Sequence, residues 1–257
     1  MWERGRGLHP VDRALVLLAA AQPGMSWEQL ARLQIGRRDI LLLALRELTF
    51  GSRLASYAEC PHCGEKLEFD HPVSDILASL LMPGAEEPTG KVESGLVADS
   101  VKALEMDGFT VRFRLPDSFD LAAVAGCREP EEARRLLLER CVLEVVRKGG
   151  EAQETSGSNP DSIALRDLPG EVVSGLSAQI GRADPGADIA LDLTCPDCDH
   201  RWSITFDIVQ FFWAEINNLA KRLLREVHTL ARAYGWSEAD ILAMSAARRL
   251  AYLEMVL

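Results

Sequence analysis

Cys60-Pro61-His62-Cys63 and Cys195-Pro196-Asp197-Cys198 decide how the rest of this sequence is organised. Each stretch is a C-x-x-C turn, and residues 64–194 separate the two. Together they supply four thiolates, the ligand number of a closed tetrahedral zinc site, and a two-residue spacer lets both sulfurs of a turn face one ion. We therefore predict a split zinc ribbon, with residues 64–194 as an excursion closed at its base by the metal. The predicted ligands are Cys60, Cys63, Cys195 and Cys198, with one Zn²⁺ per chain.

Disulfide bonds and unconnected thiols are the alternatives for these four cysteines. Disulfide frameworks belong to small secreted domains, whereas this chain has 257 residues and only six cysteines. No signal peptide is recognised at its start, so we expect a reducing cytoplasm. A catalytic zinc keeps one position open for water, and four sulfurs leave none. The zinc is therefore expected to be structural, with its binding energy contributing to folding.

The remaining cysteines and histidines offer no second site. Cys127 and Cys141 stand among apolar and helix-forming residues, which predicts small core side chains. His62 and His200 lie in or beside the turns and could replace a cysteine as ligand, but four cysteines already complete the site. The sequence has no P-loop, G-x-G-x-x-G, H-E-x-x-H or G-x-S-x-G motif. No catalytic residue is predicted, and we expect no enzymatic activity.

The chain is acidic: 28 Lys and Arg residues against 39 Asp and Glu residues give a formal charge of −11. A nucleic-acid module usually carries positive charge on its binding face, so this balance disfavours wholesale binding to phosphates. The longest apolar runs, at residues 14–21 and 40–45, are far shorter than the roughly 20 residues that span a bilayer. We therefore expect a globular protein without a membrane span.

Residues 1–51 are predicted to be helical. A helix over 10–21 is followed by a short helix that Ser26 opens as a capping box and that ends at Ile35-Gly36. A third helix over 37–50 places Leu41, Leu45 and Leu48 on its apolar face.

Residues 52–206 are predicted to hold the zinc ribbon and the elements inserted into it. Strands over 53–59 and 65–70 flank the first turn, and strands over 188–194 and 201–206 flank the second. Asp107-Gly108 predicts another hairpin, with strands over 101–105 and 109–115. The other expected elements are a short helix or apolar segment over 73–81, helices over 129–147 and 168–180, a helix capped by Asp117 or Ser118, and Gly-rich loops over 83–95 and 149–160.

Residues 207–257 are predicted to form a C-terminal helical arm. Its main element is an amphipathic helix over 208–234, which Gly235 ends and which is followed by a helix capped by Ser237 and a helical terminus. The apolar stripe of the long helix has spacings of four and three and consists of Ile208, Phe212, Ile216, Leu219, Leu223, Val227, Leu230 and Tyr234.

A basic stripe follows the same long helix away from its apolar face. It consists of Lys221, Arg225, His228 and Arg232, which also have helical spacing. One interpretation is an ordinary solvated face. The other is a docking surface for an acidic protein partner, with nucleic acid as the less favoured ligand.

Several longer stretches have a further meaning when they are taken together. They are residues 35–51 with Cys60-Pro61-His62-Cys63-Gly64, the run Phe113-Arg114-Leu115-Pro116-Asp117-Ser118-Phe119-Asp120-Leu121, the second cysteine turn with Trp202, and Gly235-Trp236-Ser237-Glu238-Ala239-Asp240-Ile241-Leu242 after the long helix. In these stretches the chain resembles the baseplate-hub assembly proteins, a chaperone-like family of contractile-tailed phages and extracellular contractile injection systems. The resemblance implies a cytoplasmic, bacterial or phage-derived protein that contacts baseplate or hub proteins and helps to build a baseplate or becomes part of it.

These observations predict an α+β, mainly helical fold in three parts. They are an N-terminal helical segment over 1–51, a zinc-ribbon core with an inserted hairpin and helices over 52–206, and a C-terminal helical arm over 207–257. The predicted function is that of a non-enzymatic baseplate assembly factor or component. The alternative is a zinc-ribbon module that binds nucleic acid or associates with transcription, which the basic stripe favours and the net charge disfavours.

Overall fold

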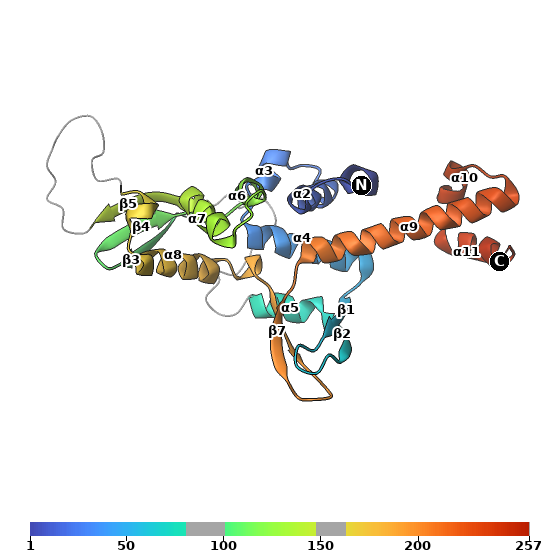
Figure 1. Cartoon of the computed structure of the whole chain (residues 1–257). Coiled ribbons are helices and arrows are strands. Elements are labelled where there is room, and N and C mark those ends of the chain that lie inside the picture. The colour runs from blue at the N-terminus through green and yellow to red at the C-terminus, as the bar shows by residue number, and fades with distance from the viewer. Residues whose placement is uncertain (81–100, 148–162, 257) are drawn as a thin grey trace.

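The fold is mainly helical α+β, with small antiparallel hairpins, a four-cysteine cluster and a long C-terminal helix (Figure 1). This is the predicted fold class. The computed structural model describes residues 1–80, 101–147 and 163–256. The loops predicted over 83–95 and 149–160 lie outside these residues.

The N-terminal part contains four helices: α1 (Trp2–Gly5), α2 (Pro10–Ala21), α3 (Trp27–Ala31) and α4 (Ile35–Phe50). The first of them was not predicted. Ser26 caps α3, and the complete capping box that its sequence predicts is present. The side chain of Ser26 accepts from the Gln29 N–H, and the Gln29 side chain accepts from the Ser26 N–H.

Two predictions about α4 are wrong. Gly36 lies in the first turn of α4 rather than at the end of α3. Residues 184–187 pack so closely against it that there is no room for a side chain: a Cβ at this position would collide with Asp184 Oδ1 and lie 2.9 Å from the Ala187 nitrogen. Leu48, placed on the apolar face by its spacing, is 86% exposed. Apolar residues surround much of α4, so their spacing alone could not show which face would pack against the core.

Two hairpins carry the cysteine turns. Strand β1 (Arg53–Glu59) pairs antiparallel with β2 (Lys66–Pro72), and β6 (Ala190–Thr194) pairs antiparallel with β7 (Arg201–Thr205). Helix α5 (Val73–Leu80) follows the first hairpin directly, and its buried side joins the main core. All four strands agree with the predicted ones within two residues.

A three-stranded antiparallel sheet forms from β3 (Lys102–Met106), β4 (Phe109–Phe113) and β5 (Val142–Arg147). Asp107 and Gly108 both have positive φ, as the predicted Asp-Gly turn requires.

The helix predicted over 129–147 is wrong in its last six residues. Helix α7 (Pro130–Cys141) ends at Cys141, and the next residues form the strand β5 rather than further helix. Val145 faces Val111 of β4 and is 3% exposed. An apolar residue at position 145 suits both a helix and a strand, and the free edge of β4 decided in favour of the strand, where β-branched residues pack well.

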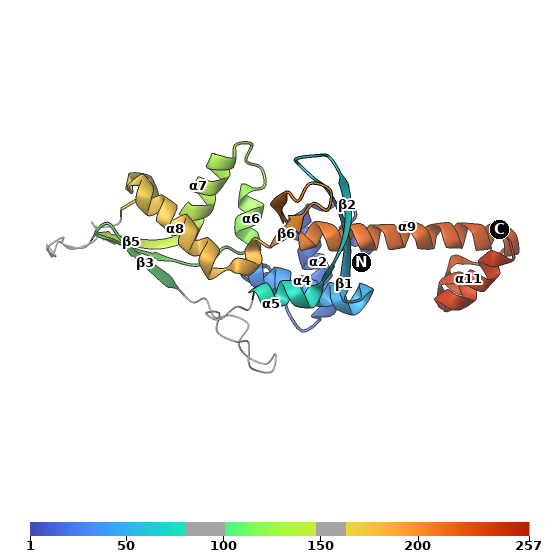
Figure 2. The same cartoon turned by 90° about the horizontal axis from the view of Figure 1, so that it is seen from below.

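Helices α7 and α8 (Gly170–Ala183) pack against this sheet, and α6 (Ser118–Val124) lies beside α7 (Figure 2). Short 3₁₀ turns, η1 (Leu165–Asp167) and η2 (Pro185–Ala187), precede and follow α8. Asp117 is the N-cap of α6, one of the two residues predicted for that position.

The C-terminal arm begins with α9 (Ile208–Tyr234), whose bounds are those predicted. Gly235 ends it with φ of 70°, the left-handed conformation that glycine adopts without a steric penalty. Ser237 caps α10 (Glu238–Ala243), and α11 (Ala246–Glu254) follows. Figure 1 shows α9 running out of the body, with α10 and α11 folded back on its far end. No helix in the described ranges is long and apolar enough to cross a membrane.

The buried apolar side chains of the described residues form three clusters. The first joins α2, α3, α4 and α5 to the base of the hairpins and the start of α9. The second lies between the three-stranded sheet and helices α7 and α8. The third is small and holds α10 and α11 on the end of α9 through Leu230, Ile241 and Leu253. The division into 1–51, 52–206 and 207–257 stays a prediction.

A buried ionic network stabilises the segment that joins the first two clusters. Asp120 is fully buried, and its carboxylate accepts hydrogen bonds from Arg114 at 2.5 and 2.9 Å and from Arg140 at 2.9 Å. Asp117 lies beside this network and contacts Arg32 of the N-terminal part at 3.4 Å. The run 113–121 therefore positions the sheet against the N-terminal helices.

Candidate metal centre

The two cysteine turns have the same backbone structure. In each turn the N–H of the first cysteine donates to the carbonyl five residues later, at 2.8 Å from Cys60 and 2.9 Å from Cys195. The carbonyl of that cysteine accepts from the N–H four residues later, at 2.9 and 3.0 Å respectively. The residue four positions after the first cysteine has positive φ in both turns: 77° at Gly64 and 55° at Asp199. Glycine suits this conformation, and aspartate is one of the few other residues that tolerate it.

Folding brings the four predicted ligands together. The sulfurs of Cys60, Cys63, Cys195 and Cys198 all lie within 4.8 Å of one another. Across the two turns, Cys60 Sγ lies 3.7 Å from Cys198 Sγ, and Cys63 Sγ lies 3.6 Å from Cys195 Sγ. A regular tetrahedron with zinc–sulfur bonds of about 2.3 Å has sulfur–sulfur edges of about 3.8 Å. The cluster is thus consistent with one metal site, and its four cysteines are free thiols.

The neighbouring thiols shift the pKa values of Cys60 and Cys63 in opposite directions. Burial raises the pKa of the Cys60 thiol, but the N–H groups of Cys63 and His62 and the thiols of Cys63 and Cys195 together lower it more, to about 7. For Cys63 the N–H of Glu65 lowers the pKa, whereas burial and the other three thiols raise it to about 12. Without a cation, one thiolate therefore makes ionisation of its neighbours unfavourable. A bound divalent ion would remove this repulsion and let all four ionise.

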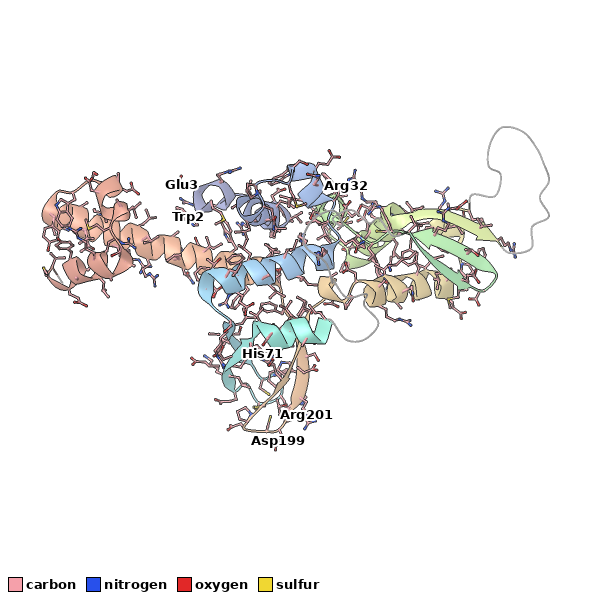
Figure 3. All side chains as sticks on the ribbon, turned by 180° about the vertical axis from the view of Figure 1, so that it is seen from behind. Trp2, Glu3, Arg32, His71, Asp199 and Arg201 are labelled. Carbon is pink, nitrogen blue, oxygen red and sulfur yellow. The ribbon has the colours of Figure 1, made fainter. Side chains whose placement is uncertain are left out.

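The cluster lies at the tips of the two hairpins. Asp199 and Arg201, which directly follow the second turn, mark this outer end in Figure 3. The chain leaves the first turn along β2, returns to the body, and reaches the second turn along β6. The two ends of residues 64–194 therefore meet at the four cysteines, as predicted. The sequence did not show that this meeting point lies at the outer ends of two hairpins that are joined to the body separately.

Three rings stack beside the cysteines without joining them. The ring centroids of His62 and His200 lie 5.4 Å apart, and those of His200 and Trp202 lie 6.0 Å apart. Neither histidine belongs to the group of possible metal ligands in the described chain.

The other two cysteines lie elsewhere. Cys141 is fully buried beside the ionic network, as predicted, and burial raises the pKa of its thiol to about 12. Cys127 lies in the turn between α6 and α7 and is only partly buried, so its prediction as a core side chain is wrong.

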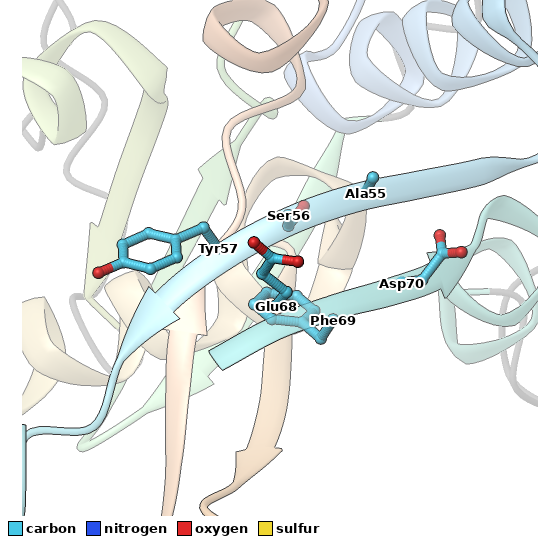
Figure 4. Close-up of a pocket in the computed structure, with 6 residues that line it drawn as sticks. All are labelled: Ala55, Ser56, Tyr57, Glu68, Phe69 and Asp70. Atoms are coloured by element: carbon cyan, nitrogen blue, oxygen red, sulfur yellow. The ribbon is translucent and has the colours of Figure 1, made fainter. Parts of the chain in front are cut away.

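The structure contains a groove between the two hairpins that the sequence did not predict. It has a volume of about 460 Å³. Its apolar lining residues are Phe69, Leu191, Ile204, Phe206 and Phe211, and its polar ones include Ser56, Thr205, Asp207 and Gln210. Figure 4 shows its outer continuation along β1 and β2, where Tyr57 and Glu68 lie directly opposite each other in the strand register. The alternation of β1 and β2 could have indicated an outward face, but not a second hairpin opposite it.

The basic stripe lies on the surface. Lys221, Arg225, His228 and Arg232 are all exposed on the part of α9 that leaves the body. Exposure agrees with both interpretations of the stripe, and a role in partner binding stays a prediction.

The comparisons with known proteins identify the family. A family model described as T4 bacteriophage base plate protein matches residues 24–213. The chain belongs to the T4 bacteriophage base plate protein family. No curated protein and no solved structure matches it.

The matched part of this base plate family member includes both cysteine turns, the groove between the hairpins and the run 113–121. It ends in the second turn of α9, so α10, α11 and most of α9 lie beyond it. Family membership suggests a baseplate-related role and confirms the resemblance at this level. The narrower assignment to hub assembly goes beyond the match.

Proposed function

We propose that this protein is a non-enzymatic assembly factor or structural component of the baseplate of a contractile, phage-tail-like injection system. It acts through protein–protein contacts with baseplate or hub proteins. The observation that carries the proposal is the family match over residues 24–213. The geometry of the four cysteines supports it, because a site closed by four sulfurs leaves no position for a substrate or a catalytic water.

In this proposal Cys60, Cys63, Cys195 and Cys198 bind one structural zinc ion. Each hairpin has only two strands, and an isolated two-stranded hairpin is marginally stable in water. A shared ion would hold the two hairpins side by side and keep the groove between them open. The free energy of metal binding would then become folding free energy of the ribbon.

The basic stripe and the arm that carries it would supply the partner surface. Lys221, Arg225, His228 and Arg232 are presented on a helix that projects from the body, which suits capture of an acidic partner.

The test is co-expression of the tagged chain with the baseplate, tube and sheath proteins encoded beside it. We expect specific co-purification of one or more baseplate proteins, and particles with defective baseplates when the gene is deleted. Mass spectrometry of purified particles would separate a component, which stays in the particle, from an assembly factor, which does not. Normal, fully active particles from the deletion strain would refute the proposal.

The second candidate is a zinc-ribbon module that binds nucleic acid. The exposed basic stripe and the stacked rings of His62, His200 and Trp202 favour it, since bases stack on such rings. The acidic residues around the ribbon oppose it, because they repel phosphates. Retention of DNA or RNA that decreases steeply with salt would favour this candidate, whereas no retention at 50 mM salt would exclude it.

A further inference from the structure

The middle of α9 carries an apolar surface that none of the three clusters includes. The apolar stripe is buried at Ile216 by the first cluster and at Leu230 by the third. Between them lie Leu223, which is only partly buried, and Leu224, which is 47% exposed. Neither residue belongs to, or packs against, any of the three clusters. The apolar stripe thus continues through a part of α9 that packs against no cluster, and this part is available to a partner.

The charge of this arm is opposite to that of the rest of the chain. Residues 217–257 contain six Lys and Arg against four Asp and Glu, a net charge of +2. The remaining 22 basic and 35 acidic residues give −13. Lys221 and Arg225 are exposed on either side of Leu224 in the sequence, so the uncovered apolar surface has a basic border.

The ribbon provides a surface of the complementary kind. Residues 53–72 and 190–207 together contain eight Asp and Glu against three Lys and Arg. Glu68 is exposed on the outer part of the groove, and Asp207 lines its inner end. The lining includes the apolar side chains of Phe69, Ile204 and Phe211 and the polar residues Ser56, Thr205 and Gln210. Four thiolates with one divalent ion would add two further negative charges beside it.

The arm cannot reach the groove of its own chain. Both Figure 1 and Figure 2 show α9 running straight away from the hairpins, and α9 is one continuous helix of 27 residues. A complementary basic helix must therefore come from another molecule.

We propose that the arm of one copy of this chain docks in the groove between the hairpins of a second copy. The contact follows the helix-in-groove mode, in which apolar side chains spaced along one helix face enter the groove. Leu223 and Leu224 enter the apolar part, and Lys221 and Arg225 face the acidic border. A volume of about 460 Å³ admits side chains of the helix rather than the helix itself.

This contact joins two different surfaces, so it is heterologous, and it leaves a free arm and a free groove at the ends of any open assembly. Repetition gives either a closed ring or an open chain. The proposal rests on the charge and the uncovered surface of this chain and not on the proposed baseplate role.

The experiment uses the purified full-length chain and two charge-reversed variants. The arm variant is Lys221→Glu with Arg225→Glu, and the groove variant is Glu68→Lys with Asp70→Lys, two exposed carboxylates that line the outer part of the groove. A matched control reverses two exposed arginines outside both surfaces, Arg128→Glu with Arg134→Glu. Light scattering after size-exclusion chromatography gives the mass of each sample over a concentration series at low and high salt, and circular dichroism confirms that each variant is folded.

We expect the parent chain and the control to associate with rising concentration, and less so at high salt because exposed charges are screened. Each charge-reversed variant alone should associate at least about tenfold more weakly than the parent. Mixing the two variants should restore pairs, because a reversed arm then meets a reversed groove. A parent chain that stays monomeric at all concentrations in low salt, or two folded variants that associate like the parent, would overturn the proposal. Capture of baseplate proteins is a separate measurement, so this result leaves the proposed function untouched.

Discussion

The ribbon and the helical body of this protein are stabilised by different interactions. In the outer hairpins, over 55–72 and 194–207, the buried residues are Cys60 and Cys195 alone. In the body, side chains such as Leu42, Leu43 and Val172 are completely buried, and apolar clusters join helices to strands. The body can therefore fold through the hydrophobic effect. The ribbon has no apolar core of its own at its outer end, so its structure there depends on the cysteines.

The largest expected difference between the two regions comes from removing the metal. Cys60→Ser should abolish binding of the single zinc ion and open the outer hairpins, because structural zinc supplies on the order of 10 kcal/mol in small zinc domains. Hydrogen exchange should show loss of protection in β1, β2, β6 and β7, with α4 and α9 still protected. Elemental analysis gives the metal content. Cys127→Ser is the matched control, since this cysteine lies outside the cluster. A Cys60→Ser protein that keeps one zinc and its hairpin protection would show that the outer hairpins do not depend on the cysteines.

The next largest effect is expected in the body. Asp120→Ala leaves the guanidinium of Arg114 without its buried partner, and loss of one member of a buried ion pair costs about 3–5 kcal/mol. Urea unfolding followed by helical circular dichroism measures this loss. The metal content should stay at that of the parent. Exposed Asp188→Asn serves as the control and should leave the free energy of unfolding nearly unchanged.

The pH dependence of the body follows from two buried carboxyl groups with opposite shifts. Burial raises the pKa of Asp120, but hydrogen bonds from Arg114, Asp117 and Arg140 lower it more, so its pKa falls below the usual value. Asp120 therefore stabilises the fold above the pKa of the unfolded chain, and this stabilisation is lost as the pH falls through its folded pKa. Burial of Asp184 has the larger effect there, and its pKa is raised despite the hydrogen bond from the Gly36 N–H. Its contribution is present at low pH and is lost as the pH rises through the folded pKa.

Asp184→Asn isolates the second carboxyl group. An asparagine oxygen can still accept from the Gly36 N–H, and no charge is buried, so the variant should melt at a slightly higher temperature than the parent at pH 7. This difference should shrink toward pH 3 to 4, where the parent Asp184 is protonated. Melting curves across this range provide the measurement. A variant that is equally destabilised at every pH would show that burial of the charge is not the deciding cost.

The smallest expected effect compares the two cysteine turns with each other. Asp199 has the left-handed conformation that Gly64 has in the first turn. Asp199→Gly should stabilise the second turn by up to about 1 kcal/mol, whereas Gly64→Ala should destabilise the first by about 1–2 kcal/mol because of the Cβ contact in this conformation. Competition with a zinc chelator measures both changes as shifts in zinc affinity. Opposite signs for the two variants are required, and equal losses would show that the turns differ in more than this residue.

Prediction from the sequence was most successful where local chemistry decides. The capping box at Ser26, the Asp107-Gly108 turn and the end of α9 at Gly235 all depend on residues close in the chain, and all three are confirmed. The cysteine pairing was also predictable, because the ligand number of a closed site requires both turns. Predictions failed where two structures shared one apolar pattern. The valines of β5, directly after α7, suited a helix or a strand. The leucines of α4 surround much of the helix, so their spacing did not show that Leu42 and Leu43 would be buried and Leu48 exposed.

The sequence by itself determined the elements of the ribbon: two Cys-Pro-x-Cys turns, the strands that flank them and the four sulfurs that can share an ion. Only the tertiary structure decided that this site lies at the outer ends of the hairpins, that a groove opens between them, and that Gly36 serves a close contact with Asp184 rather than a helix end. The reason is physical. Turns and caps are set by hydrogen bonds within a few residues, whereas the position of a site depends on which apolar faces pack together, and that choice involves segments far apart in the chain.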